Sequence, residues 1–277
     1  PTNGWNLIKK VINLDEPLPL GDYLGCGQQN GTLTQSEIDK KLENIRLLID
    51  QDRGGRPHAY PNPVQTIEYM MKNYADQGVQ VYLELASTKE SSLQRVDTPD
   101  IGEADFKPEE YAEQGALSPI AARIVMKILY YARMARNDTL RPTCMLAREV
   151  TEWSRASDRK LFRLVCYVHT TRNFVQQAYI GDDIDNLDLL QYNDADLAND
   201  LRTSKSNSGA LTVIIGPNSL FPLTATCKKQ TVVSHSSTES EIVSTDQALR
   251  TDGLPLLTLF LSLIHILRAP QTGTNIV

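Results

Sequence analysis

The stretch from Tyr192 to Glu241 constrains the fold more than any other part of the chain, because strand patterns and a helix start follow each other within it. Leu187–Ala195 alternates between two faces, with Leu187, Leu189 and Ala195 on one of them. Ala210–Ile215 is a β-branched run between glycines, and Leu220–Cys227 follows turn residues. Ser236-Ser-Thr-Glu239 has the spacing of a helix capping box. The stretch therefore predicts an α/β (α+β) fold in which a three-stranded antiparallel sheet precedes one helix.

Two carboxylates in this stretch are candidates for chemistry. Asp194 lies on the first predicted strand and Glu241 lies one turn into the helix, whereas Glu239 is expected to cap Ser236. Two acids on one side of a sheet repel each other unless a cation lies between them. Oxygen ligands favour Mg²⁺, and paired Mg²⁺ ions are used to cut phosphodiesters. Spacing alone favours a solvated turn at Asp194 and Asp196 and a surface position for Glu241.

The segments NDADLAND, SKSNSG and CKKQTVVSHSSTESE resemble the ribonuclease H domain of copia-type retrotransposon Pol polyproteins. The family pattern is roughly S-D-A-D-W-A-G-D, then S-T-S-G, then K-K-Q-x-x-V-x-x-S-S-T-E-A-E-Y. The resemblance implies that Asp194 and Glu241 are catalytic residues and Mg²⁺ ligands, and that the substrate is the RNA strand of an RNA–DNA hybrid. The chain departs from the pattern at Leu197, Asn199 and Ile242, none of which replaces a metal ligand.

The resemblance is incomplete at both ends. The polymerase motif Y-V-D-D of the family has no counterpart in the chain, and the pattern stops near Phe260, before the family's third and fourth ribonuclease H acids. We therefore expect a fragment of a reverse transcriptase and ribonuclease H polyprotein that is inactive by itself and needs the remainder of the Pol polyprotein. The alternative is a non-catalytic, nucleic-acid-binding remnant of a decayed element.

Basic residues are concentrated in the middle of the chain. Residues 121–172 contain 11 Lys and Arg against 4 Asp and Glu, whereas acidic residues outnumber basic ones on both sides. A basic segment next to a metal site would suit contact with a phosphate backbone, and a solvated helical face would have the same composition. The arginines expected to contact nucleic acid are Arg133, Arg136, Arg148, Arg155, Arg159 and Arg163.

The resemblance and the composition together suggest four regions. Residues 1–112 are expected to be the distal, thumb-like part of a reverse transcriptase with a linker, and 113–180 a basic helical connection. Residues 181–260 would be the first half of a ribonuclease H-like domain. Residues 261–277 begin with LSLIHI, the in-frame translation of CTGTCTCTTATACACATC from sequencing adaptors, so this tail is expected to be an artefact; the other reading is a natural apolar helix.

Several local patterns complete the expectations. Asn30-Gly31 predicts the turn of a hairpin within Leu20–Gln35, and Ser36–Asp50 and Thr66–Tyr74 have helical spacing. Ser118-Pro119 predicts the start of a basic helical region. In its last helix, from near Ser157, Lys160 is expected outside and the following residues inside: Leu161, Leu164, Val165 and Val168. Ile242, Val243 and Leu249 are expected to form the apolar face of the last helix.

The four cysteines show neither zinc-site spacing nor a disulfide pattern, which indicates reduced thiols in the cytoplasm or nucleus. The resemblance adds association with an intracellular particle. The apolar run at the C-terminal end is too short and too interrupted to span a bilayer, so no membrane partner is expected.

Overall fold

Strands from both halves of the chain join in one antiparallel sheet. The computed structural model describes residues 21–34, 36–41, 43, 64–102, 105–200 and 203–268. Within them, the sheet has seven strands in the order β1-β2-β3-β4-β7-β6-β5. The strands are β1 (Asp22–Tyr23), β2 (Cys26–Leu33), β3 (Val64–Met70), β4 (Gln176–Ile180), β5 (Asp188–Asp200), β6 (Lys205–Gly216) and β7 (Ser219–Lys229).

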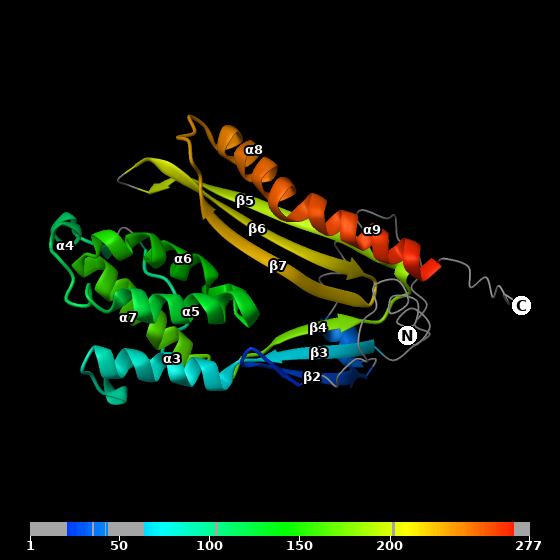
Figure 1. Cartoon of the computed structure of the whole chain (residues 1–277), viewed down its shortest axis with the longest axis horizontal. Coiled ribbons are helices and arrows are strands. Elements are labelled where there is room, and N and C mark those ends of the chain that lie inside the picture. The colour runs from blue at the N-terminus through cyan, green and yellow to red at the C-terminus, as the bar shows by residue number, and fades with distance from the viewer. Residues whose placement is uncertain are drawn as a thin grey trace, which may run out of the picture.

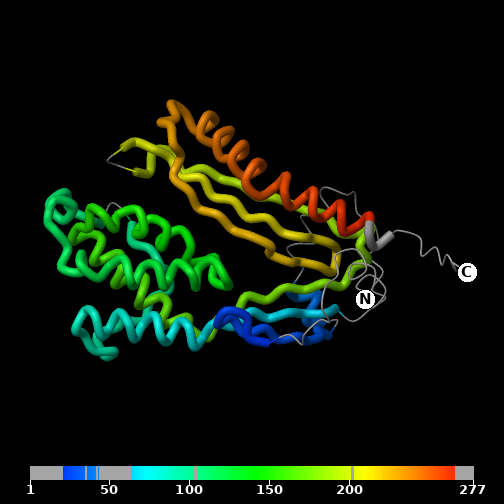
Figure 2. The backbone as a smooth tube through the Cα atoms, viewed as in Figure 1, coloured from blue at the N-terminus to red at the C-terminus, as the bar shows by residue number. Residues whose placement is uncertain are grey.

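Helices fill the chain between β3 and β4 and again after β7. The first group gathers at one end of the sheet, and the second runs alongside β5 and β6 as one long rod (Figures 1 and 2). The helices are α3 (Lys72–Leu85), α4 (Pro108–Ala112), α5 (Ala121–Ala135), α6 (Leu140–Glu149), α7 (Arg155–Thr170), α8 (Ser237–Ala248) and α9 (Leu254–Arg268), with a π-helical turn at Leu249–Gly253. No helix among the described residues is long and apolar enough to cross a membrane.

The mixed helix-and-sheet prediction is confirmed, but the three-stranded sheet is wrong because the sheet has seven strands. The predicted strands are present as β5, β6 and β7, and they pair consecutively in an antiparallel manner. β7 then joins β4 through the single pair of Tyr179 and Leu220. The sheet therefore continues across the proposed boundary at residue 181, which a reading of local patterns could not detect.

Two predictions in the first half of the chain are wrong. Val64–Met70 is a strand instead of helix, because it pairs with both β2 and β4 while Val64 and Thr66 are buried. The hairpin turn lies at Leu24-Gly25, not Asn30-Gly31, and β2 runs straight through the latter. Leu24 and Gly25 have φ angles of 52° and 81°, and Gly25 N–H donates to Asp22 Oδ1. Residues 36–41 are helical, while the rest of Ser36–Asp50 lies largely outside the described residues.

The main hydrophobic core lies among α3, α5, α6 and α7. Its α7 members are the four residues expected to lie inside: Leu161, Leu164, Val165 and Val168, each at most 1% exposed. Lys160, expected outside, is 8% exposed because its ammonium pairs with Glu149 of α6. α5 begins at Ala121, shortly after the Pro119 start signal, and α7 begins after the cap residue Ser154, whose Oγ accepts from Ser157 N–H.

α8 packs on the sheet through small polar residues, and the predicted apolar face is wrong. Ser240, Ser244 and Ala248 are buried, whereas Ile242 and Leu249 are 64% and 44% exposed. Ser240 and Ser244 return to one face every fourth residue, and short side chains let helix and sheet approach closely. Their polar groups are satisfied, since Ser244 Oγ donates to the carbonyl oxygen of Asp194 and Gln230 Nε2 donates to that of Ser240.

The start of α8 agrees with half of the predicted capping box. Ser236 Oγ accepts a hydrogen bond from Glu239 N–H at 3.1 Å, as the sequence predicts. The Glu239 carboxylate accepts from the backbone N–H of His235, at 2.7 Å, one residue earlier than a capping box requires. Glu239 is thus engaged at the helix end and Glu241 is not, which leaves Glu241 available toward β5.

Candidate functional site

Asp194 lies on β5 and faces away from α8. β5 is regular over residues 188–196, where Asp194 pairs with Gly209 of β6, so its side chains alternate between faces. Gln191 donates to the carbonyl oxygen of Ala248 and Asn193 donates to Thr245 Oγ1, so these two residues face α8. Asp196 lies on the other face, where it pairs with Arg141 of α6 at 2.9 Å. Asp194 shares the face of Asp196.

Glu241 comes from α8, on the opposite side of β5. Its Oε1 accepts a hydrogen bond from the backbone N–H of Ala195 at 3.3 Å, so its carboxylate lies directly beside the residue that follows Asp194. Ala195 belongs to the face that carries Gln191 and Asn193. Glu241 thus meets β5 at the residue that follows Asp194, at a backbone N–H that lies in the plane of the sheet.

Two carboxylates supply only part of a metal site. A Mg²⁺ ion needs several oxygen ligands at fixed distances around one point. Among the described residues, no group of three or more His, Cys, Asp or Glu side chains could hold a metal ion. Strand alternation places the Asp194 side chain on the face toward α6, and Glu241 meets β5 at the backbone of Ala195, so a metal ion shared by the two acids stays a prediction.

The face that carries Asp194 looks onto a cavity. The cavity has a volume of about 380 Å³ and lies between α6 and the strands β5, β6 and β7. Arg141, Asp196 and Asn207 line it, together with Tyr192 and Cys227. Beyond it on the same face, Val213 and Ile215 form a small apolar core. The face under α8 is the polar one, so the apolar and cavity-lining surface points toward the helices of the first group.

Arg136 is a structural residue. It is 4% exposed and pairs with Asp138 at 2.7 Å, while it also donates to Tyr131 Oη and to the carbonyl oxygen of Thr171. Its guanidinium lies near the rings of Tyr131 and Phe174. Burial and these partners leave no room for a phosphate, so the prediction that Arg136 contacts nucleic acid is wrong.

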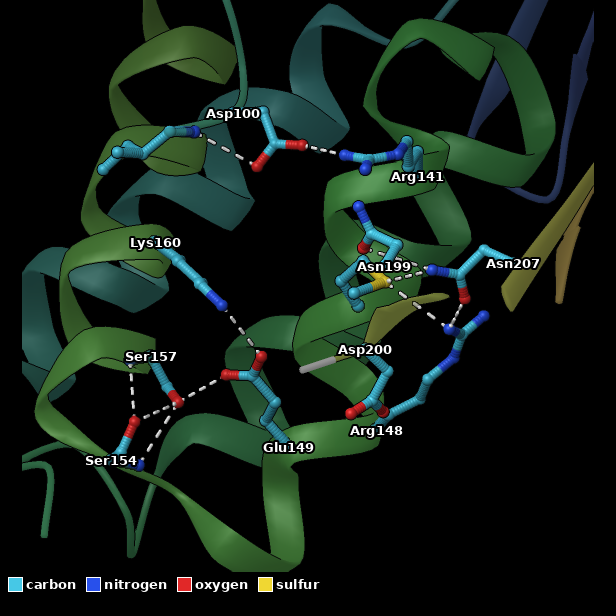
Figure 3. A network of polar contacts seen from close by, with 12 residues as sticks. Asp100, Arg141, Arg148, Glu149, Ser154, Ser157, Lys160, Asn199, Asp200 and Asn207 are labelled. Carbon is cyan, nitrogen blue, oxygen red and sulfur yellow. Dashed lines mark hydrogen bonds and ion pairs between the residues drawn. The ribbon is translucent and has the colours of Figure 1, made fainter. Parts of the chain in front are cut away.

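The other predicted nucleic-acid contacts are mostly engaged within the protein. Arg155 pairs with Glu113 at 2.9 Å and Arg159 with Glu110 at 2.7 Å. A backbone hydrogen bond from Lys107 and the Arg159 guanidinium lower the pKa of Glu110. Arg163 donates to Thr98, and Arg148 donates to Asn207 of β6, as Figure 3 shows for Arg148. Arg133 is exposed and makes no hydrogen bond or ion pair with the described residues. Arg148, Arg155 and Arg159 thus tie elements together, which supports the solvated or structural reading of the basic segment.

The structure also brings together residues that sequence spacing did not connect. Arg141 of α6 pairs with Asp196 of β5 and Arg148 of α6 donates to Asn207 of β6, while Cys227 of β7 lines the same cavity as Arg141. All four cysteines are free thiols. The only signal in the sequence is that Arg141 and Arg148 recur at a helical spacing, and this spacing does not reveal the strand residues that they meet.

Comparisons with known proteins add no assignment. No protein-family model, no curated protein and no solved structure matches the chain. The order of elements and the contacts between them therefore carry the functional argument.

Proposed function

We propose that the chain is a piece of a copia-type Pol polyprotein, and that residues 181–260 are the first half of its ribonuclease H-like domain. The complete polyprotein would copy RNA into DNA and hydrolyse the RNA strand of RNA–DNA hybrids with Mg²⁺. The chain as given would be inactive. Three consecutive antiparallel strands followed by a capped helix are the elements that the resemblance implies, and β5, β6, β7 and α8 supply them in that order.

One contact carries this proposal. Glu241 of α8 reaches the backbone of Ala195, directly after Asp194, so helix and strand meet at the two positions that the resemblance selects. Two carboxylates are too few to hold a metal pair, which is why the chain by itself would lack activity. β5 is also the last strand in the order of the described sheet, so its outer edge is open to further strands.

The test compares the chain with a version in which residues 261–277 are replaced by the remaining half of a copia-type domain. The unextended chain should not cut a labelled RNA–DNA hybrid in Mg²⁺, and the extended chain should cut its RNA strand. Asp194→Asn and Glu241→Gln should each abolish this cutting. Asp246→Asn is the matched control, because Asp246 is an exposed acid on α8 that pairs with Arg250.

Two results would overturn the proposal. Cutting by the unextended chain would show that the two carboxylates suffice without the family's further acids. Cutting by the extended chain that survives Asp194→Asn would show that the resemblance assigns the wrong residue.

A further inference from the structure

A second cavity lies against α7, in the group of helices at one end of the sheet (Figure 1). Among the described residues it shares no lining residue with the cavity beside Asp194. Its volume is about 440 Å³, a size suited to small organic ligands. The α7 residues that line it follow helical spacing, so a single face of the helix forms one wall. They are Arg155, Asp158, Arg159, Phe162, Arg163 and Cys166. Half of these side chains are guanidinium groups, which makes the wall a candidate for binding an anion.

The segment 93–101 forms the opposite wall because it packs against α7. The backbone N–H of Gln94 donates to Cys166 Sγ at 3.4 Å, and Val96, which is 7% exposed, packs beside the same cysteine. Gln94, Val96 and Ile101 line the cavity from this side. The cavity is thus bounded by a helix face and by a segment that the helix holds in place, and part of its lining is apolar.

Two of the arginines keep N–H groups that no described residue accepts. Arg163 donates through Nε and Nη2 to the carbonyl oxygen and the hydroxyl of Thr98, at 2.8 and 2.7 Å, which leaves Nη1. Arg159 uses Nη1 alone, toward Glu110 and the carbonyl oxygen of Asp105, which leaves Nε and Nη2. A guanidinium presents its donors in a planar fork that matches the oxygens of a phosphate. Because Arg159 and Arg163 are one helical turn apart, one phosphate can accept from both.

The acid in this wall is already engaged. Both carboxylate oxygens of Asp158 accept hydrogen bonds, from the backbone N–H groups of Ala116 and Leu117 at 2.6 and 3.2 Å and from Trp153 Nε1 at 2.6 Å. These donors partly offset its negative charge and fix the carboxylate on the loop before α5. Asp158 therefore has a structural role here and leaves the arginines to set the sign of the cavity.

The carboxylates that pair with the arginines lie outside the cavity lining. Glu110 pairs with Arg159 and Glu113 pairs with Arg155, and neither glutamate is among the described residues that line the cavity. Arg163 has no carboxylate partner among the described residues, so its charge is the one that a ligand can neutralise. The lining thus presents three positive side chains against one negative side chain.

The uncharged part of the lining suits a flat ring. The ring of Phe162 is held by Tyr82, whose ring centre lies 6.4 Å away, and it lines the cavity together with Ile101. An aromatic side chain can stack on any nucleobase, because every base has a π-face. The amide of Gln94 also lines the cavity and offers one acceptor and two donors to the polar edge of a base.

We propose that this cavity binds a nucleoside monophosphate, with its phosphate between Arg159 and Arg163 and its base against Phe162 and Ile101. Charge-assisted hydrogen bonds from a guanidinium to a phosphate are strong and directional, so the two arginines fix the ligand's orientation. The walls on both sides favour a small molecule over a polymer backbone. The site shares no residue with the proposed ribonuclease H half-domain, so it stands or falls independently of hybrid cutting.

The experiment titrates the full chain with the 5′-monophosphates of adenosine, cytidine, guanosine and uridine, each by isothermal titration calorimetry. At least one should bind with a Kd below about 1 mM. The matching nucleoside, which lacks the phosphate, and inorganic phosphate, which lacks the base, should each bind at least about tenfold more weakly. Absence of binding by all of the monophosphates, or equal affinity for the nucleoside, would overturn the proposal.

Substitutions separate the two parts of the site. Arg163→Gln removes the charge but keeps a side chain that can donate to Thr98, and it should raise the Kd by about tenfold or more. Ile101→Trp fills the cavity without changing any charge and should raise the Kd to a similar extent. Arg133→Gln is the matched control, because Arg133 is an exposed arginine of α5 that does not line the cavity, and it should leave the Kd unchanged.

Urea unfolding of each variant shows whether it is folded before its affinity is compared. If Arg163→Gln does not unfold cooperatively, Arg159→Gln answers the same question, since both arginines are expected to contact the phosphate. An unchanged Kd in a folded Arg163→Gln, Arg159→Gln or Ile101→Trp variant would overturn the proposal. An equal loss of affinity in Arg133→Gln would do so as well, because it would show attraction to the general positive charge of the helices.

Discussion

Replacing Lys160 by Met should destabilise the protein more than any surface change on α7. Lys160 Nζ lies 3.1 Å from Glu149 Oε1, and the two side chains are 8% and 12% exposed. Ser157 Oγ donates to the second oxygen of Glu149, and Ser154 joins the same network (Figure 3). The substitution leaves the Glu149 carboxylate buried with one partner fewer.

The expected loss follows from that unpaired charge. Removing one partner of a buried ion pair typically costs about 3–5 kcal/mol, because the remaining charge keeps its desolvation penalty. The ammonium also lies 5.3 Å from the ring centre of Phe106 and 5.2 Å from that of Tyr111, contacts worth about 0.5–2 kcal/mol. We therefore expect Lys160→Met to lower the free energy of unfolding by about 3–5 kcal/mol.

The assay is urea unfolding followed by far-UV circular dichroism, with the m-value checked for constancy. The double variant Lys160→Met, Glu149→Leu should lose less stability than Lys160→Met alone, because it removes both charges. Arg155→Met is the control, since its pair with Glu113 is exposed on the same helix and should leave the midpoint unchanged. A loss below about 1 kcal/mol, or a double variant whose loss equals the sum of its parts, would refute the reasoning.

Four further substitutions have expected effects on the free energy of unfolding in the same assay. Ser236→Ala removes the oxygen that accepts from Glu239 N–H and should lower the free energy of unfolding by about 1 kcal/mol. A loss of helical signal without any change in the urea midpoint would count against a stabilising role of this cap. Leu164→Ala, at a fully buried position, should cost about 2–5 kcal/mol, while Ile242→Ala, at 64% exposure, should change stability by less than about 0.5 kcal/mol. Arg136→Met should lower the urea midpoint strongly without altering the affinity for an RNA–DNA hybrid. A salt-dependent loss of hybrid binding in that variant would show that Arg136 contacts nucleic acid.

Local patterns predicted the elements that their own residues determine. The strands β5, β6 and β7 and the start of α8 follow from alternation, glycine boundaries and the Ser236 cap, all of which operate within a few residues. The buried residues of α7 follow from helical spacing. The prediction that Lys160 lies outside is wrong because the helical spacing of α7 does not show that Glu149 of α6 lies beside Lys160 in space.

The predictions that are wrong concern residues whose structure depends on pairing between segments that lie far apart in the sequence. Val64–Met70 has a spacing that suits a helix, but hydrogen bonds to β2 and β4 override that preference. The hydrogen bond from Arg148 to Asn207 likewise depends on how α6 lies on the sheet. Sequence resemblance selected Asp194 and Glu241 by position in a motif, and a motif does not say which face of a strand a side chain occupies.

The face of Asp194 is fixed by its neighbours rather than by its own contacts. Gln191 and Asn193 hold β5 against α8 through Ala248 and Thr245, and strand alternation then assigns Asp194 to the side of α6. A slip of one residue would turn Gln191 and Asn193 away and break both hydrogen bonds, so these contacts hold β5 in the register that brings Ala195 to Glu241. Activity restored by extension should therefore depend on the Asn193–Thr245 contact, and Thr245→Val should lower that activity. Activity that is unchanged in Thr245→Val would show that this contact does not position the site.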